Sequence, residues 1–255
     1  MTLAPVEPLV LRELRVAFGD VRAVDGVDLV VRAGSVTGLV GPNGCGKTTT
    51  LRAVLGLVRP AAGTVAVAGI PGGLAARAHV AWVPDEPGGL DELTVDEFVD
   101  LVGALWRADA GYAARAALLL DAFGLATRRR SMLASLSHGQ RRLVTIAAAV
   151  ALRRALLIVD EATAALDPEA VITLREVVRT VAARGGGVLL ATQDLAFAER
   201  VCDRVTLLAR GRVAAEGTSH ELRAQFGAAS LEEVFVAAAG VAERQQEVRS
   251  ALEAL

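Results

Sequence analysis

The chain has 255 residues, 53% of them hydrophobic, and a formal net charge of −2 with basic residues spread along its length. This length is sufficient for one large domain with a substantial core, and the charge gives no sign of a nucleic-acid-binding surface. No apolar run reaches the roughly 18 residues of a membrane-spanning helix, and two cysteines form no disulfide framework, so we expect a soluble protein of a reducing compartment.

Short runs rich in valine, leucine and isoleucine alternate with helical patterns, which is typical of a mainly parallel sheet flanked by helices. We expect buried strands at 36–40, 64–69, 79–84, 155–160 and 188–192. A helix should follow the first strand, at about 47–57, and another should begin at Pro168, since proline suits a first helical turn.

The pattern changes twice more along the chain. From about 85 to 152 the apolar residues recur at helical spacing, which predicts an inserted helical region. Residues 204–217 predict two strands joined at Gly211, and the tail from Thr218 is helical and mixed in charge.

The stretch GPNGCGKT at 41–48 matches the G-x-x-x-x-G-K-[ST] pattern between a predicted strand and a predicted helix. Its Lys47 is the only lysine of the chain. A compact ammonium on a flexible stem fits between the β- and γ-phosphates of a nucleotide, where the planar fork of arginine would not. We therefore predict that this glycine loop binds nucleotide phosphates, through Gly41, Pro42, Asn43, Gly44, Cys45, Gly46, Lys47, Thr48 and Thr49.

An acid pair follows the apolar run at 155–159. Alone, Asp160 and Glu161 are compatible with a common capping arrangement. Beside a phosphate loop, Asp160 is expected to hold Mg²⁺ together with the Thr48 hydroxyl, and Glu161 to orient and polarise the attacking water. The catalytic candidates are Lys47, Glu161 and Gln193.

The sequence SLSHGQRR at 135–142 lies between the helical stretch and the strand that ends at Asp160. At this point the chain resembles the ATP-binding-cassette (ABC) ATPases, whose Leu-Ser-Gly-Gly-Gln motif has the same place. The resemblance runs from about Leu9 to Gly217. It implies ATP and Mg²⁺ as ligands and a second ABC ATPase subunit, whose glycine loop holds the phosphate reached by Ser137, His138, Gly139 and Gln140. On their own, these residues would also suit an ordinary capped helix.

The resemblance also implies an organisation. It predicts an α/β fold: a P-loop NTPase core with a parallel-sheet lobe, N-terminal antiparallel β strands and an inserted α-helical subdomain. The nucleotide-binding domain would span 1–217, with its core at 8–84 and 153–217 and the helical subdomain at 85–152. Residues 218–255 would form a C-terminal helical extension.

Further positions follow from the same resemblance. Phe18 matches the aromatic that stacks on adenine, with a core phenylalanine as the alternative. Asp167, in the loop after the acid pair, would contact the partner subunit. Asp85 stands where relatives usually have glutamine and could meet Mg²⁺ or water.

Two departures from the usual residues of this family bear on the rate of ATP hydrolysis. His138 replaces a glycine near the partner's phosphate, and Gln193 replaces the usual switch histidine. Glutamine can donate a hydrogen bond to the γ-phosphate but cannot become a cation or relay a proton, so hydrolysis should be slower than usual. Cys45, at a helix N-terminus, is expected to have a lowered pKa and to be reactive.

The stretches 83–99 and 230–240 resemble the drug, antibiotic and polysaccharide exporter branch, although Val234 and Phe235 also suit plain helix packing. The resemblance thus implies an ATPase on the inner face of the cell membrane that drives a separate transmembrane permease, docked near 85–94. One alternative is a hydrolysis-impaired cassette that acts as an ATP-dependent latch in a heterodimer. A cassette of translation or DNA repair is disfavoured, because tandem cassettes, coiled-coil insertions and zinc-binding cysteines are absent from the sequence.

Overall fold

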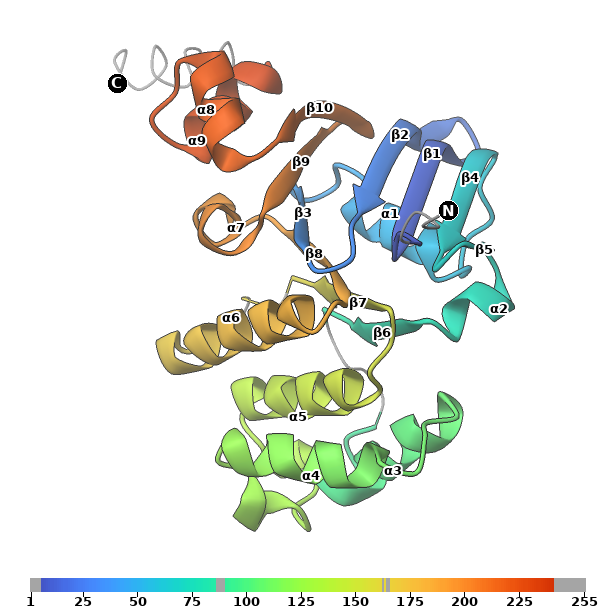
Figure 1. Ribbon diagram of the computed structural model, residues 1–255, viewed down its shortest axis with the longest axis vertical. Helices are drawn as coiled ribbons and strands as arrows, with labels where there is room; N and C mark the ends of the chain where they lie inside the picture. Colours follow the sequence, from blue (N-terminus) through green and yellow to red (C-terminus); the bar gives the residue numbers. More distant parts are fainter. Residues whose placement is uncertain (1–5, 86–89, 162, 164–165, 241–255) are drawn as a thin grey trace, which may run out of the picture.

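The computed structural model describes residues 6–85, 90–161, 163 and 166–240, and within these residues the strands form two sheets (Figure 1). The first sheet is antiparallel, in the order β2-β1-β4-β5. Its strands are β1 (Leu9–Phe18), β2 (Val21–Val31), β4 (Ala62–Val67) and β5 (Ile70–Pro71). Gly19, with φ +57°, supplies the left-handed turn that joins β1 to β2.

The second sheet has the order β10-β9-β3-β8-β7-β6. Its strands are β3 (Val36–Val40), β6 (Val80–Val83), β7 (Leu156–Asp160), β8 (Gly187–Thr192), β9 (Arg204–Ala209) and β10 (Arg212–Gly217). All neighbours pair in parallel except β9 and β10. Every residue of β3, β7 and β8 is buried, which explains why these strands are continuous apolar runs rather than alternating ones.

Helices lie against both faces of this sheet. They are α1 (Lys47–Val54), α2 (Leu74–Arg77), α3 (Val95–Leu105), α4 (Tyr112–Ala122), α5 (His138–Ala151), α6 (Pro168–Ala183), α7 (Leu195–Val201), α8 (Ser219–Phe226) and α9 (Leu231–Ala238). Figure 1 shows α3, α4 and α5 gathered at one end of the molecule and α8 and α9 at the other. Short 3₁₀ turns at Ala126–Arg128 and Leu133–Ser135 lead from α4 into α5.

The six-stranded sheet separates two apolar cores. Alternate residues of one strand enter different cores because successive side chains of a strand point to opposite faces. In β8, Val188 and Leu190 join the core formed with α5, α6 and α7, whereas Leu189 and Ala191 join the core under the antiparallel sheet and α1. Packing into both cores fixes the position of each strand along its axis, and therefore the position at which the strand ends.

The structure confirms the predicted fold class and all five predicted strands, with end points that differ by at most two residues. The first helix ends at Val54 rather than near 57, because Gly56 takes a positive φ and closes it. The strand expected to reach residue 69 ends at Val67, where Ala68 and Gly69 turn with positive φ into β5. Among the described residues, none of the helices combines the length and the apolar character that crossing a bilayer requires.

Candidate active site

Four predicted site segments meet at one edge of the parallel sheet. Strands β3, β8, β7 and β6 are consecutive neighbours and run in the same direction. Gly41 follows β3, Gln193 follows β8, Asp160 ends β7, and Asp85 lies two residues beyond β6. Since ligands of open α/β sheets bind outside the carboxyl ends of the strands, this edge is the place for a site.

The glycine loop (residues 41–48) needs its glycines for space. A Cβ on Gly41 would lie 2.2 Å from the carbonyl oxygen of Leu208, and one on Gly46 would lie 2.5 Å from that of Ala23. Gly46 also has a φ of +112°. It precedes α1, which begins at Lys47 with no side-chain cap, so the N–H groups of the first turn are left to an anion.

Lys47 lies at the centre of the site. Its side chain is 5% exposed, and its Nζ donates to the carbonyl oxygens of Gly41 at 2.7 Å and Pro42 at 3.3 Å. The same ammonium is 3.1 Å from Oε1 of Glu161. Lys47 therefore connects the glycine loop with Glu161, the residue that follows β7.

Asp160 is a buried carboxyl group whose charge is poorly compensated. The residue is 3% exposed, and within the described part of the chain its Oδ1 has no hydrogen-bond partner. Burial raises the pKa of Asp160 to about 6, and the charges of Asp85 and Glu161 act in the same direction. The cations of Lys47 and Arg142 oppose the rise in this pKa.

Glu161 is fixed by three contacts. Its N–H donates to the Ala191 carbonyl at 2.8 Å, its Oε2 accepts from the N–H of Gln193 at 3.2 Å, and its Oε1 pairs with Lys47. Its φ of 44° is unusual for a residue with a Cβ and costs of order 1 kcal/mol. The neighbouring contacts thus hold the carboxylate in a conformation that the backbone alone would avoid.

The residues at this edge fit a nucleotide with Mg²⁺. The orphaned Oδ1 of Asp160 and its raised pKa indicate a position where a divalent cation would supply the missing positive charge. Thr48 is exposed at the start of α1, where its hydroxyl can face the same ion. No cluster of three or more His, Cys, Asp or Glu side chains suited to a metal occurs among the described residues.

Asp85 and Gln193 are both exposed at this edge. Asp85 is close enough to Asp160 for its charge to raise the pKa of that carboxyl group. Gln193 precedes Asp194, whose side chain caps α7 by accepting from the N–H of Phe197 at 2.8 Å. The cap fixes the turn after β8 and places Gln193 beside Glu161.

The segment 137–140 forms the start of α5. Ser137 Oγ accepts from the N–H of Gln140 at 3.2 Å, and Gln140 Oε1 accepts from the N–H of Ser137 at 3.1 Å, a reciprocal capping box. Ser137 and His138 are exposed, and no hydrogen bond or ion pair joins residues 137–140 to the glycine loop in the described structure. Capping explains the spacing of Ser137 and Gln140 and leaves the outward faces of His138 and Gly139 open to another molecule.

Phe18 ends β1 and pairs with Val21, in the hairpin whose second strand places the Ala23 carbonyl against Gly46 of the glycine loop. It is 52% exposed, so the alternative of a core phenylalanine is wrong. Asp167 is exposed and caps α6 through a 2.8 Å hydrogen bond from the N–H of Ala170. Ala165, which precedes it in the same predicted loop, lies outside the described residues.

The prediction for the Cys45 thiol is wrong. The residue is 4% exposed, and burial raises the pKa of the thiol, outweighing the opposing effects of Lys47 and the nearby backbone N–H groups. Its Sγ lies 2.8 Å from where a Cβ on Gly41 would be, so the side chain fills the inside of the glycine loop. A helix N-terminus lowers a thiol pKa and apolar burial raises it, and at Cys45 burial is the larger effect.

Sequence reasoning missed Arg142. This residue is 2% exposed on the second turn of α5, and its guanidinium donates to the carbonyl oxygens of Pro84, Asp85 and Asp160. Burial lowers the pKa of the guanidinium. The only sequence signal is an arginine immediately before the apolar run 143–152, which by itself indicates no more than the end of a buried surface.

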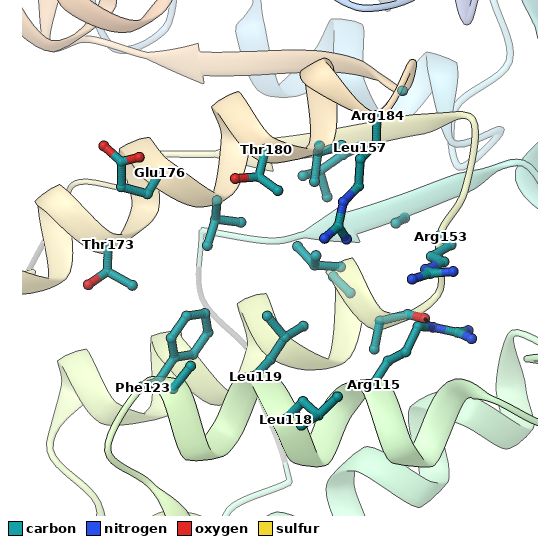
Figure 2. A pocket seen from close by; sticks show the side chains of 18 of the residues that line it. Arg115, Leu118, Leu119, Phe123, Arg153, Leu157, Thr173, Glu176, Thr180 and Arg184 are labelled. Carbon is teal, nitrogen blue, oxygen red and sulfur yellow. Dashed lines mark hydrogen bonds between the residues drawn. The ribbon is translucent and has the colours of Figure 1, made fainter.

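Two clefts lie away from the glycine loop. The larger, about 730 Å³, is bounded by α4, α5 and α6, with Leu118, Leu119 and Phe123 opposite Thr173 and Thr180, and Arg115, Arg153 and Arg184 gathered at one end (Figure 2). The smaller, about 340 Å³, is lined by Trp82, Pro84, Leu90, Phe98, Leu101, Val102, Leu105, Trp106, Thr145, Ala148, Ala149 and Leu152.

Comparison with known proteins gives consistent results. The model of the ABC transporter family matches residues 24–164. The chain is 38% identical over 223 residues to the Nod factor export ATP-binding protein I of Burkholderia lata, covering 86% of this chain and 73% of the relative. It is 38% identical over 238 residues to the daunorubicin/doxorubicin resistance ATP-binding protein DrrA of Streptomyces peucetius, covering 89% and 70%.

Solved structures show the same arrangement. An ATP-binding subunit of an ABC transporter superposes with a TM-score of 0.84 at 36% identity, covering 90% of this chain and 98% of that one. A nucleotide-free ATP-binding cassette superposes with a TM-score of 0.77 at 23% identity, again over 90% and 98%, and supports the fold alone.

Proposed function

Because the chain belongs to the ABC transporter family, we propose that it is the subunit that binds and hydrolyses MgATP to drive a separate membrane permease in export. The observation that carries the proposal is the meeting of Lys47, Asp160 and Glu161 at one sheet edge, with Nζ 3.1 Å from the Glu161 carboxylate. Relatives named for Nod factor export and for daunorubicin resistance support the exporter assignment.

Each group has a separate task in this proposal. The glycine loop and the first turn of α1 bind the phosphates, and Lys47 turns from its carbonyl partners toward the β- and γ-phosphates. Thr48 and Asp160, with Asp85 nearby, would hold Mg²⁺, which when bound would neutralise negative charge on the phosphates. Glu161, released from Lys47, orients and polarises the attacking water.

Adenine recognition and dimer formation use exposed residues. Phe18 presents its ring at the hairpin beside the glycine loop, where it stacks on the base. A second subunit, identical or related, closes over the nucleotide with its own residues 137–140, while Asp167 contacts that partner. The exposure of Ser137, His138 and Asp167 supports these roles.

The permease docks at the smaller cleft. Its walls are apolar residues of α3 and α5, and it borders Pro84 and Leu90 on either side of residues 86–89. Those four residues, part of the predicted docking segment 85–94, lie outside the described structure. A cytoplasmic helix of the permease with an apolar face fits such a groove and would hold the chain at the inner face of the cell membrane.

The central test compares steady-state ATPase activity of the purified chain with that of Glu161→Gln. We expect ATP binding, measured with a fluorescent analogue, to remain within about threefold of the wild type, and turnover to fall by about 10²-fold or more, the scale of lost general-base catalysis. Lys47→Ala should instead lose nucleotide binding. A wild-type chain that binds ATP and hydrolyses it no faster than Glu161→Gln would refute the hydrolytic role.

That same outcome would favour the second candidate, a hydrolysis-impaired latch in a heterodimer. Gln193 in place of a switch histidine and His138 in place of a glycine favour it, whereas Asp160 and Glu161 oppose it.

Partner assignment needs its own test. Affinity capture of the chain from detergent-solubilised membranes should recover a polytopic permease. Recovery of ribosomes or DNA without a permease would overturn the transport assignment.

A further inference from the structure

Arg142 joins three segments that are distant in the sequence. From α5 its Nη1 donates to the carbonyls of Pro84 and Asp85, after β6, and its Nη2 donates to the carbonyl of Asp160, at the end of β7. Among the described residues, the side chain forms no ion pair with a carboxylate and its Nε has no hydrogen-bond partner. The direct contacts of this buried cation are thus with main-chain oxygens, while its charge acts on the Asp160 carboxyl group without an ion-pair contact.

The peptide bond between Asp160 and Glu161 is anchored at both ends by these contacts. Its oxygen accepts from Arg142, and its N–H donates to the Ala191 carbonyl at 2.8 Å. Glu161 follows with a φ of 44°, a conformation that a free backbone rarely adopts. A hydrogen bond that originates in α5 therefore acts together with the contacts to Ala191, Gln193 and Lys47 in directing the Glu161 side chain.

From this geometry we propose that Arg142 is a positioning residue for ATP hydrolysis, which aligns Glu161 and Asp85 through the backbone carbonyls of Asp160 and Asp85 when α5 is docked on the sheet. The inference rests on the proposed function. Helix α5 begins with residues 137–140. Through Arg142 this helix acts on the sheet edge that holds Asp85, Asp160 and Glu161. Arg142 itself contacts neither phosphate nor water in this role.

Methionine is the informative replacement. Methionine is unbranched like the arginine stem, and it removes the cost of desolvating the charge, which offsets part of what the three carbonyls lose with their donor. Arg142→Met should fold and bind nucleotide, yet leave the Asp160 carbonyl without its donor. Arg142→Lys keeps a cation but not the planar fork that reaches both segments, so it should restore turnover only in part.

The chain supplies a matched control. Arg154 is a partly buried arginine just after the C-terminal end of α5. Its Nη2 donates to the carbonyl of Trp106, and its Nε is likewise buried without a hydrogen-bond partner among the described residues. Arg154→Met removes the same chemical group without touching Asp85, Asp160 or Glu161. We expect it to leave both kcat and KM for ATP within about twofold of the wild type, as for sites that share no partners.

The experiment measures kcat and KM for ATP and urea unfolding of the full chain for all variants. Arg142→Met is expected to lower kcat by about 10- to 100-fold with KM within about threefold, the pattern of an interaction that matters in the transition state. In a Glu161→Gln background the same substitution should lower the residual rate less than about twofold, because the two residues act in one unit.

Three results would overturn the inference: an unchanged kcat in Arg142→Met, a loss of kcat that only parallels a loss of stability, or full additivity with Glu161→Gln. Failure of the proposed function is recognised separately. There, wild-type turnover already equals that of Glu161→Gln, whereas failure of this inference alone leaves the wild type active and Arg142→Met equally active.

Discussion

Replacing Asp160 with asparagine should stabilise the nucleotide-free chain near neutral pH. The pKa of this carboxyl group is raised from 3.8 to about 6 in the fold, chiefly by burial. A carboxyl group with a raised folded-state pKa contributes fully to stability below its unfolded pKa. The contribution is lost as the pH rises through the folded value, because the group must then ionise in a poorly solvated place.

The magnitude follows from the shift. Two pKa units correspond to about 3 kcal/mol at pH 7.5, and to about half of that at pH 5, where the folded carboxyl group is still largely protonated. Asparagine keeps the shape but never ionises, so Asp160→Asn should exceed the wild type by about 2–3 kcal/mol in free energy of unfolding at pH 7.5. The gain should shrink markedly at pH 5.

The assay is urea unfolding, followed by far-UV circular dichroism, in EDTA without nucleotide at both pH values. Asp20→Asn, an exposed acid in the β1–β2 turn, is the control and should differ little from the wild type at either pH. MgATP should stabilise the wild type and reduce or reverse the advantage of the variant. A difference that is the same at pH 5 and pH 7.5, or a variant less stable at pH 7.5, would refute the reasoning.

Three other predictions test the loops around the site. Gln193→His should raise kcat for ATP severalfold by supplying the missing switch imidazole, and an unchanged steady-state rate would show that this position does not limit turnover. Gly41→Ala should lower the free energy of unfolding, measured by urea titration, by about 1–3 kcal/mol, because its Cβ would lie 2.2 Å from the Leu208 carbonyl oxygen. The control Gly217→Ala would place its Cβ 3.2 Å or more from side-chain atoms, and should lower the free energy of unfolding less. Alkylation of Cys45 by iodoacetamide at pH 8 should be at least about tenfold slower in the folded chain than in urea, and equal rates, followed by mass spectrometry, would contradict the burial of the thiol.

Sequence predicted the edge of the sheet well because its information there is local. Eight contiguous residues define the glycine loop, and five apolar residues lead directly to Asp160 and Glu161. The capping boxes of α3 and α5 are also local, since Thr94 and Ser137 each stand three residues before a glutamate or glutamine.

What was missed depends on contacts between distant segments. The role of Arg142 requires the carbonyls of Asp85 and Asp160 to converge on α5, and nothing in the ten residues around it indicates this. Cys45 was predicted to be reactive from its place before a helix, but its burial arises because Leu208, far along the chain, closes over the glycine loop. In both cases tertiary packing decides the electrostatic environment, which local sequence cannot show.

The presence of a single lysine, Lys47, also determines how the chain can be chemically modified. Because no other lysine is present, the one side-chain amine of the protein is 5% exposed inside the glycine loop, and surface positive charge comes from guanidinium groups. Guanidinium groups stay charged at any physiological pH and are not substrates for lysine acetylation or ubiquitination. Apart from the N-terminal amine, an amine-selective label can therefore react only at this site, and bound nucleotide should slow that reaction further.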